Sequence, residues 1–487
     1  MPTLSIEVEG GVYNSELERI SDILVVDTSS RRIIGLNKTP PSYSKRIRIK
    51  GFVFPSFIDA HMHLTGTGLK LLGVDLGTAR SPRDVGLLLS RAKGGIAFGR
   101  GWDQESFEPE GALPTRGMLD KYVGDRPALA VRVCGHMAVA NTQTLIATEV
   151  HRKYPGLVDT EKGILFEDAV EYTVNKLLET TSIDQYIETA VKELTSTGIA
   201  GVSSMSCSPR EYHTLLKLSR RGKLRLHVAC YPDYYKIEAI RPEEDSKVSL
   251  AGVKLYADGS FGAHTAALKE PYNDKDTRGK LLLSRKEIVE IASRYIPAEL
   301  RVATHAIGDL AIEEVLSAYE KLRIGSMGRI EHFSISPDEY IDRASNLGVY
   351  IVVQPYFRIG DWWLPKRIGD TRTGLSYRFN TMVSKGVKLV LSTDSPVDPY
   401  YPWETLKAAY SECDTVLCRK EDALAPREAF KSYTRLAAEA SGGTVSLLGE
   451  IYSGAPLSSA AWTPVDPLTT KWSGPARLLD DVVEDLP

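Results

Sequence analysis

Two histidines, His61 and His63, follow the apolar run FIDA and are separated by a single residue. On a β-strand, residues i and i+2 point to the same side, so both imidazoles can reach one ion. Three more residues that can bind a metal lie at or near the ends of other short apolar runs. They are His305 in RVATHA, His332 in RIEHF and Asp394 in KLVLSTD. Imidazoles and carboxylates are the ligands that transition metals such as zinc prefer, so this set predicts a transition-metal site.

A single histidine is more often a core or surface residue than a ligand. The chain has nine histidines, however, and four of them fall at predicted strand ends together with an aspartate. All of these residues are much less expected to fall at strand ends by chance than any single one of them is. By contrast, His151 and His213 lie in polar, helix-like surroundings and are predicted to be surface residues, and His227 is predicted to be structural.

Lys254 lies in the run AGVKLYADGS, between the segments that carry the first and the later ligands. A buried lysine beside metal ions is unfavourable as an ammonium. Carboxylation by carbon dioxide would turn it into an anionic bridge between two metals. The alternative is a lysine paired with Asp258.

The elements that must position these residues are short apolar runs, many with helix-like stretches between them, such as residues 184–198, 310–325 and 338–348. Runs of this kind are typical of parallel strands covered on both faces. The eight predicted strand segments are 52–60, 198–206, 224–230, 251–257, 300–306, 328–333, 348–355 and 386–394. A doubly wound sheet has a similar rhythm, but polar residues at the strand ends favour a (β/α)₈ TIM barrel, whose active site forms at that mouth.

Residues 51–439 are predicted to form the barrel, interrupted at about residues 75–185 by an inserted subdomain that covers its mouth. Residues 1–50 contain short strands, including a hairpin-like pair in SDILVVDTSS and RRIIGL. Residues 440–487 contain turns and further short strands. Together the two ends predict a small β-sandwich, an arrangement that brings the termini close to each other.

Composition limits the classes of function. The 487 residues carry a net charge of −3 without a dominant basic block, which argues against nucleic-acid binding. No run approaches the ~20 apolar residues of a membrane span, and the first residues lack a signal-peptide pattern. Five scattered cysteines do not indicate a disulfide framework, so a reducing cytoplasm is the predicted location. A homodimer is the default oligomeric expectation.

FPSFIDAHMHL resembles the signature that opens the amidohydrolase superfamily. GRGWDQ, LPTRGMLD, GHMAVAN, VKLYADGSFGAHTAAL, THAIGDLAI, RIEHF, QPYF and STDSPV resemble, in order, the motifs of amidohydrolase family 3, the YtcJ-like metal-dependent hydrolases. The resemblance covers about residues 20 to 455. Two positions depart from the pattern: Ser56 replaces a glycine of the signature, and SGAPLSSAAWTP lacks the aspartate of the C-terminal motif.

The resemblance implies a (β/α)₈ barrel with a β-sandwich formed by both termini, and one or two divalent metal ions, usually Zn²⁺. It implies His61 and His63 as ligands of the first metal, and His305 and His332 as ligands of the second. It further implies Lys254 as a bridging carboxylated lysine and Asp394 as both ligand and proton shuttle. It also implies three pocket residues: His136, Asp103 and Asp309.

The expected reaction is hydrolysis of an amide-type C–N bond, other than a peptide bond, in a small molecule. Metal-bound hydroxide attacks the carbonyl carbon, Asp394 carries the proton to the leaving nitrogen, and a metal or His136 stabilises the oxyanion. Arg100 and Arg358 are predicted to hold an acidic group of the substrate. Two alternatives stay open: hydrolysis of an ester, lactone or phosphotriester at the same centre, or an inert barrel with a regulatory or scaffold role.

Overall fold

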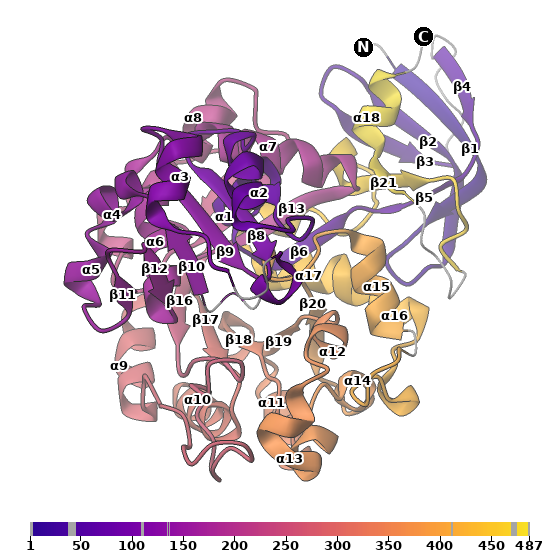
Figure 1. The fold of residues 1–487 in the computed structure, drawn as a ribbon. Coiled ribbons are helices and arrows are strands. Elements are labelled where there is room, and N and C mark those ends of the chain that lie inside the picture. Colours follow the sequence, from indigo (N-terminus) through magenta and orange to yellow (C-terminus); the bar gives the residue numbers. More distant parts are fainter. Residues whose placement is uncertain are drawn as a thin grey trace. The chain divides into compact units, whose positions relative to one another are not determined.

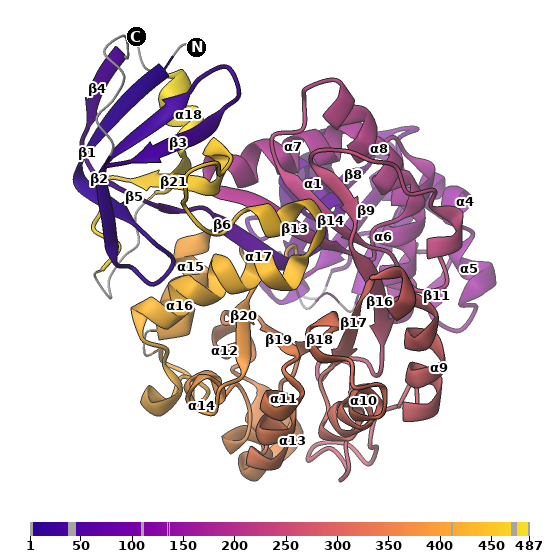
Figure 2. The same ribbon diagram turned by 180° about the vertical axis from the view of Figure 1, so that it is seen from behind.

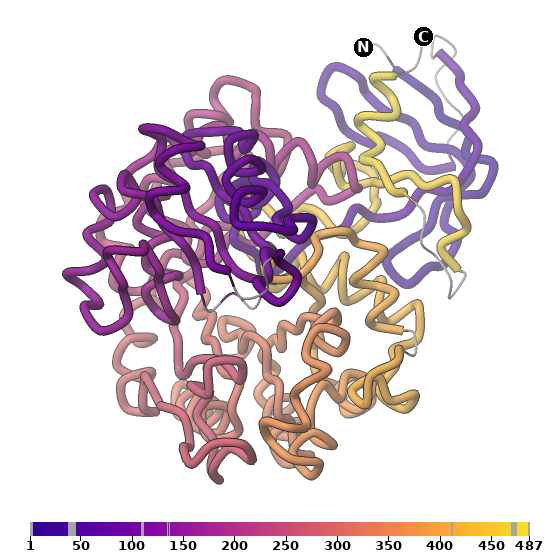
Figure 3. The backbone as a smooth tube through the Cα atoms, viewed as in Figure 1, coloured from indigo at the N-terminus to yellow at the C-terminus, as the bar shows by residue number. Residues whose placement is uncertain are grey.

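The computed structural model describes residues 3–37, 45–108, 112–133, 135, 137–410, 413–468 and 475–485. The chain separates into two compact units, one formed by residues 1–63 with 191–487 and the other by residues 64–190. Figure 3 traces the backbone through both. The predicted insertion, residues 75–185, falls inside the second unit.

The first unit is organised around parallel strands in two adjoining sheets (Figure 1, Figure 2). One sheet has the order β15-β14-β13-β6 and the other the order β16-β17-β18-β19-β20. Each predicted strand segment overlaps one of these strands, whereas β15 lies outside all of the predicted segments. Their bounds are β6 (Phe57–Met62), β13 (Ile199–Met205), β14 (His227–Tyr231), β15 (Val248–Leu250), β16 (Gly252–Tyr256), β17 (Arg301–Ala306), β18 (Gly328–His332), β19 (Tyr350–Val353) and β20 (Lys388–Leu391).

Backbone hydrogen bonds join the two sheets on both sides. Lys254 N donates to Pro232 O over 2.8 Å on one side, and Asp394 N donates to His61 O over 2.8 Å on the other. Among the described residues, however, no ladder of paired strands runs directly from β20 to β6. A closed eight-stranded barrel therefore stays a prediction, while the parallel α/β arrangement is observed.

Helices follow most of these strands, and their apolar faces are buried. In α10, for example, Ile312, Val315, Leu316 and Tyr319 recur at helical spacing and are buried, as expected for one apolar stripe. The helices of this unit are α8 (Pro209–Arg220), α9 (Arg285–Tyr295), α10 (Asp309–Leu322), α11 (Asp338–Leu347), α12 (Phe357–Gly360), α13 (Leu364–Gly374), α14 (Phe379–Ser384), α15 (Pro402–Tyr410), α16 (Pro426–Tyr433), α17 (Arg435–Ser441) and α18 (Leu479–Glu484). Helix α7 (Asp184–Ser196) spans the boundary between the units.

The first predicted strand segment, residues 52–60, is two strands rather than one. It splits at Ser56, where β5 (Phe52–Pro55) ends and β6 begins. Ser56 N donates to Ser459 O of the terminal region, whereas Phe57 N donates to Gly198 O, just before β13. The chain thus passes from one sheet to another at Ser56. The apolar residues of the segment 52–60 continue on both sides of this point, so their pattern does not reveal the change of sheet.

The two ends of the chain share one seven-stranded sheet, in which β21 pairs with β5 (Figure 1). The sequence predicts a β-sandwich here, but the described strands form a single sheet. Its apolar face packs on Leu479, Val482 and Val483 of α18 and on residues 451–457, and the two-layered sandwich stays a prediction. The strands are β1 (Thr3–Tyr13), β2 (Arg19–Asp27), β3 (Arg32–Leu36), β4 (Lys45–Ile49), β5, β21 (Ala460–Thr463) and β22 (Arg477–Leu478).

The second unit has its own six-stranded sheet, in the order β11-β12-β10-β9-β8-β7. Its core includes Leu76, Leu89, Trp102 and Leu119, so it buries apolar surface of its own. The elements are α1 (Leu64–Leu72), β7 (Val74–Asp75), α2 (Pro82–Ser90), β8 (Ala97–Trp102), α3 (Arg116–Val123), β9 (Ala128–Arg132), β10 (Met137–Ala140), α4 (Thr142–Thr148), α5 (Val150–Lys153), β11 (Val158–Asp159), β12 (Ile164–Phe166) and α6 (Asp168–Thr180).

Cys413 and Cys418 form a disulfide, with Cα atoms 5.3 Å apart. The five scattered cysteines did not indicate this bond in the sequence. The loop between the two cysteines is held to α12, because Thr415 Oγ1 donates to Arg358 O over 2.6 Å. Cys207 and Cys230 are free and buried. No helix of the described residues combines the length and hydrophobicity that spanning a bilayer requires.

Candidate metal centre

His61, His63 and Asp394 converge at the ends of β6 and β20. One donor atom from each residue lies within 4.8 Å of the other two. The Nε2 atoms of both histidines are 3.3 Å from Asp394 Oδ1. Asp394 Oδ1 is buried and makes no hydrogen bond among the described residues. Two imidazole nitrogens thus face one carboxylate oxygen at a separation longer than a good hydrogen bond.

These separations fit a metal centre. Zinc bonds of about 2.0–2.1 Å in a tetrahedron place neighbouring ligand atoms about 3.3–3.4 Å apart. The two 3.3 Å contacts of Asp394 Oδ1 have this length. The donor set, two imidazoles and a carboxylate, also suits a divalent transition metal. The three residues are therefore able to hold such an ion with little rearrangement.

The backbone at this centre is held in uncommon conformations. Asp394 has a φ of +55° and His332 a φ of +73°, in the left-handed region that non-glycine residues seldom adopt. Asp59 is buried and stabilises the first of these turns, because its carboxylate accepts hydrogen bonds from the Thr393 hydroxyl and from His61 N. Backbone outliers of this type cluster at functional sites.

The charges at the centre are set by mutual contact. Burial alone would raise the pKa of Asp394, but His61 and His63 hold it well below its usual range. Burial would lower the pKa of His63, yet the Asp394 carboxylate raises it. Asp394 is therefore an anion at neutral pH, as a ligand or a proton acceptor must be.

His305 and His332 lie beside this group. Their ring centroids are 4.5 Å apart, and the His332 ring is 5.0 Å from that of His61. Burial lowers the pKa of His305 to about 3, and burial together with His305 holds the pKa of His332 well below its usual range. Both are neutral imidazoles at pH 7 and keep a lone pair that can bind a metal.

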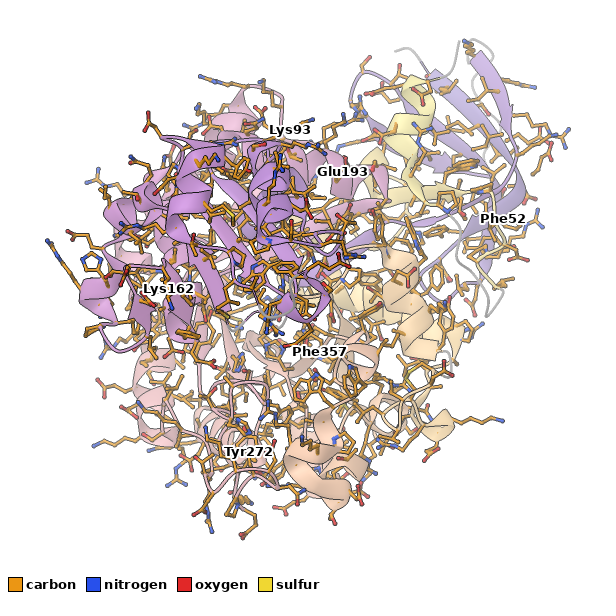
Figure 4. The ribbon with its side chains drawn as sticks, in the orientation of Figure 1. Phe52, Lys93, Lys162, Glu193, Tyr272 and Phe357 are labelled. Atoms are coloured by element: carbon orange, nitrogen blue, oxygen red, sulfur yellow. A yellow bond between two sulfur atoms is a disulfide. The ribbon has the colours of Figure 1, made fainter. Side chains whose placement is uncertain are left out.

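Each of these two rings is held through one of its nitrogens. His332 Nδ1 is 2.7 Å from Gln354 Oε1, and His305 Nε2 is 2.9 Å from Gly259 O. The ring of Phe357, labelled in Figure 4, stacks parallel to His332 at 6.0 Å. These contacts leave Nε2 of His332 and Nδ1 of His305 for another partner.

Lys254 is buried on β16, and its Nζ has no hydrogen-bond partner among the described residues. It lies 5.2 Å from the centre of the Tyr256 ring. The alternative pairing with Asp258 is wrong, because the Asp258 carboxylate accepts instead from the backbone N–H groups of Ala267, Ile307 and Gly308. Burial lowers the pKa of Lys254 to about 8.

Two predicted pocket residues, Asp309 and Asp103, have local partners. Asp309 begins α10 and accepts from Lys269 N over 3.0 Å. Asp103 lies in the second unit and accepts from Arg132 Nη2 over 2.7 Å, and Arg100 lies on β8 of that unit. His136 lies outside the described residues. The pocket roles of these residues stay predictions.

The predicted substrate contact of Arg358 is wrong. Its guanidinium is fully buried and donates to three backbone carbonyls, those of Leu417, Ala408 and Arg419, over 3.1–3.2 Å. All three guanidinium nitrogens are engaged with the protein itself. Arg358 therefore anchors α12 to α15 and to the loop that follows it, and its guanidinium is buried away from a ligand.

Sequence reasoning missed a set of buried polar residues behind the ligands. These are Asp59, Arg329, Glu331 and Gln354, each at most 2 % exposed. Asp59 is a charged residue inside the apolar run FIDAH. Arg329 and Glu331 are charged residues two positions apart in the short run RIEH. Buried charges need partners. That pattern is the signal that could have identified them.

His227 is buried at 6 % exposure, in line with its predicted structural role, and burial lowers its pKa to about 4. The unfolded chain therefore takes up a proton between about pH 6.5 and 4 that the folded chain rejects. The contribution of His227 to stability should be full above pH 6.5 and fall by about 3 kcal/mol as the pH drops to 4. Urea unfolding of His227→Gln should lose less stability than wild type by this amount over the same range.

His213 is exposed, as predicted, and serves as the matched control. His213→Gln should keep the wild-type pH dependence. Parallel stability curves for wild type and His227→Gln between pH 7.5 and 4 would contradict the assignment.

Comparison with known proteins identifies the family. The model of the amidohydrolase family matches residues 51–456. An uncharacterized metal-dependent hydrolase from Pyrococcus furiosus, of solved structure, is 32% identical, with a TM-score of 0.84 over 96% of this chain and 100% of that one. YtcJ of Bacillus subtilis (strain 168) is 28% identical over 426 residues, 80% of each chain. N-substituted formamide deformylase of Arthrobacter pascens is 24% identical over 442 residues, 80% of this chain and 79% of that one.

These similarities agree with the parallel α/β arrangement and with the ligand types at the end of β6. The family and the solved structure imply a TIM-barrel-like fold. A metal-dependent hydrolase needs a metal site, and the group of two histidines and an aspartate can hold a metal ion. The chain therefore belongs to the amidohydrolase family and is a metal-dependent hydrolase.

Proposed function

We propose that this chain hydrolyses an amide-type C–N bond of a small molecule at a divalent metal centre, with zinc as the preferred ion. The observation that carries the proposal is the set of three donor atoms of His61, His63 and Asp394, with both Nε2 atoms 3.3 Å from Oδ1. His305, His332 and Lys254 would complete a site for a second ion, with Lys254 carboxylated.

A divalent metal at this centre would supply Lewis acidity, which lowers the pKa of water to about 7 and polarises a carbonyl oxygen. The chain itself supplies the proton transfer. A carboxylate has two oxygens, so Asp394 can keep Oδ1 toward the imidazoles while Oδ2 accepts a proton from the attacking water. An O–C bond forms at the carbonyl carbon, the C–N bond breaks, and Asp394 returns the proton to the leaving nitrogen.

The amide assignment is supported by a relative. The Arthrobacter protein is named for the deformylation of N-substituted formamides, which breaks a C–N bond. We propose that the substrate of this chain has the same type of bond, and we do not assign the amine that it carries. His136 is proposed to stabilise the oxyanion, and Asp103, Asp309 and Arg100 to contact the substrate.

A substrate panel tests the bond type. Zinc-loaded protein is incubated with N-substituted formamides, N-acyl amino acids, aryl esters, lactones and a phosphotriester, and product is followed by mass spectrometry. The amides should give the highest kcat/KM, and the His61→Ala variant should abolish the activity. Turnover of an ester, lactone or phosphotriester with no amide turnover would move the function to that bond. No turnover of any member would favour an inert barrel.

A further inference from the structure

Arg329 and Glu331 form a fully buried ion pair on β18, both with 0 % exposure. They are two residues apart on the strand, so their side chains point to the same side. Arg329 Nε donates to Glu331 Oε1 over 2.6 Å, and Nη2 donates to Oε2 over 3.1 Å. This two-point contact fixes the carboxylate more firmly than a single hydrogen bond would.

The pair reaches across to β6, a strand of the other sheet. Glu331 Oε2 is 2.6 Å from His61 Nδ1, and Arg329 Nη2 donates to Ala60 O, the carbonyl that precedes His61. Arg329 Nη1 donates to Ala440 O over 3.2 Å. The backbone before His61 and the ring of His61 are therefore both held by one ion pair.

These contacts determine which ring nitrogen of His61 carries the proton. A carboxylate can only accept a hydrogen bond, so Nδ1 must be the donor. Nε2 then keeps its lone pair and faces Asp394 Oδ1 at 3.3 Å. The Arg329 guanidinium contacts both oxygens of Glu331, and this counter-charge favours the ionised carboxylate, so the proton stays on the imidazole.

His332, the residue after Glu331, is held in another way. Its Nδ1 lies against the neutral amide oxygen of Gln354, at 2.7 Å. A carboxylate acceptor makes an imidazole a stronger base, and therefore a better metal ligand, than an amide acceptor does. The two neighbouring histidines thus differ in the charge of the group behind them.

We propose that Arg329 and Glu331 are positioning residues for the reaction: they lock His61 in the Nδ1-protonated form and direct Nε2 to the metal centre. This inference rests on the proposed function, in which His61 is a metal ligand. Removing the partner of a metal-bound histidine lowers metal affinity by about 10–100-fold in known sites. A loss of that size is expected for Glu331→Gln, measured as the zinc Kd by competition with a fluorescent chelator.

Glu331→Gln leaves the Arg329 charge buried without its partner, which can destabilise the fold. The double variant Arg329→Met with Glu331→Gln removes both charges at similar volume. It should recover unfolding stability in urea and still bind zinc about 10-fold or more weakly. Asp422→Asn is the matched control, because Asp422 is buried and paired with Arg419 but is not in contact with His61. Its zinc Kd should stay within about threefold of wild type.

A second measurement is independent of metal. In metal-free protein labelled with ¹⁵N-histidine, the ring signals of His61, assigned by their absence from His61→Asn, should show a protonated Nδ1. In Glu331→Gln this preference should weaken. Wild-type His61 protonated on Nε2, or a folded Glu331→Gln variant with wild-type zinc affinity, would overturn the inference. A wild type that binds no zinc would overturn the proposed function instead. The protonated nitrogen of His61 would then still show whether Arg329 and Glu331 orient this ring.

Discussion

Asp394→Asn is expected to lower kcat/KM by roughly 10²–10⁴-fold, the contribution of a positioned general acid–base group. Asparagine keeps the shape of the side chain and an oxygen near the His61 and His63 nitrogens, but it cannot accept and return a proton. Metal binding should therefore survive in part. The measurement is steady-state hydrolysis of the best amide from the substrate panel, together with metal content by elemental analysis.

The control for this variant is again Asp422→Asn, a buried aspartate of the same unit that should retain near-wild-type turnover. An Asp394→Asn variant that turns over at the wild-type rate would remove Asp394 from proton transfer. A variant that loses all metal along with activity would reduce its role to that of a ligand.

Lys254→Ala is expected to reduce the bound metal from two equivalents toward one, and to lower kcat/KM by about 10-fold or more. The physical reason is that Lys254 Nζ is buried without a hydrogen-bond partner among the described residues, beside charged groups that include Glu331 and Asp394. Carboxylation would turn that nitrogen into part of a carbamate, whose two oxygens could each bind a metal ion. Elemental analysis and the mass of the intact native protein, about 44 Da higher when carboxylated, check both statements.

One equivalent of metal in both Lys254→Ala and wild type, with equal turnover, would make the centre mononuclear and Lys254 a structural residue. Lys254→Ala with added short-chain carboxylates provides a further control. Rescue by acetate or formate would indicate that a bridging carboxylate is the missing group.

The sequence predicts most of the strands because their signal is local. Residues 198–206, 301–306 and 328–332 are short apolar runs, and each contains a strand at nearly the predicted bounds. The ligand residues His61, His63 and Asp394 could be predicted for the same reason, since each directly follows such a run and parallel strand ends meet at one edge. The resemblance to a known family supplied the roles of these residues, which spacing alone did not.

The errors come from contacts between distant segments. Arg358 looked available for a substrate because its sequence neighbours are aromatic and basic, but carbonyls some 50–60 residues away occupy its guanidinium. The role of the Arg329 and Glu331 pair was hidden because its partners on β6, His61 and Ala60, lie far away in the sequence.

Metal content tests the central claim most directly. Protein purified without chelators is analysed for divalent metals, beside a double variant carrying His61→Ala and His63→Ala. We expect one or two equivalents per chain in the wild type, and one equivalent fewer in the double variant, because two of the three converging donors are gone. A folded wild type that holds no metal, even after incubation with zinc, or a double variant that keeps the full complement, would contradict the proposed centre.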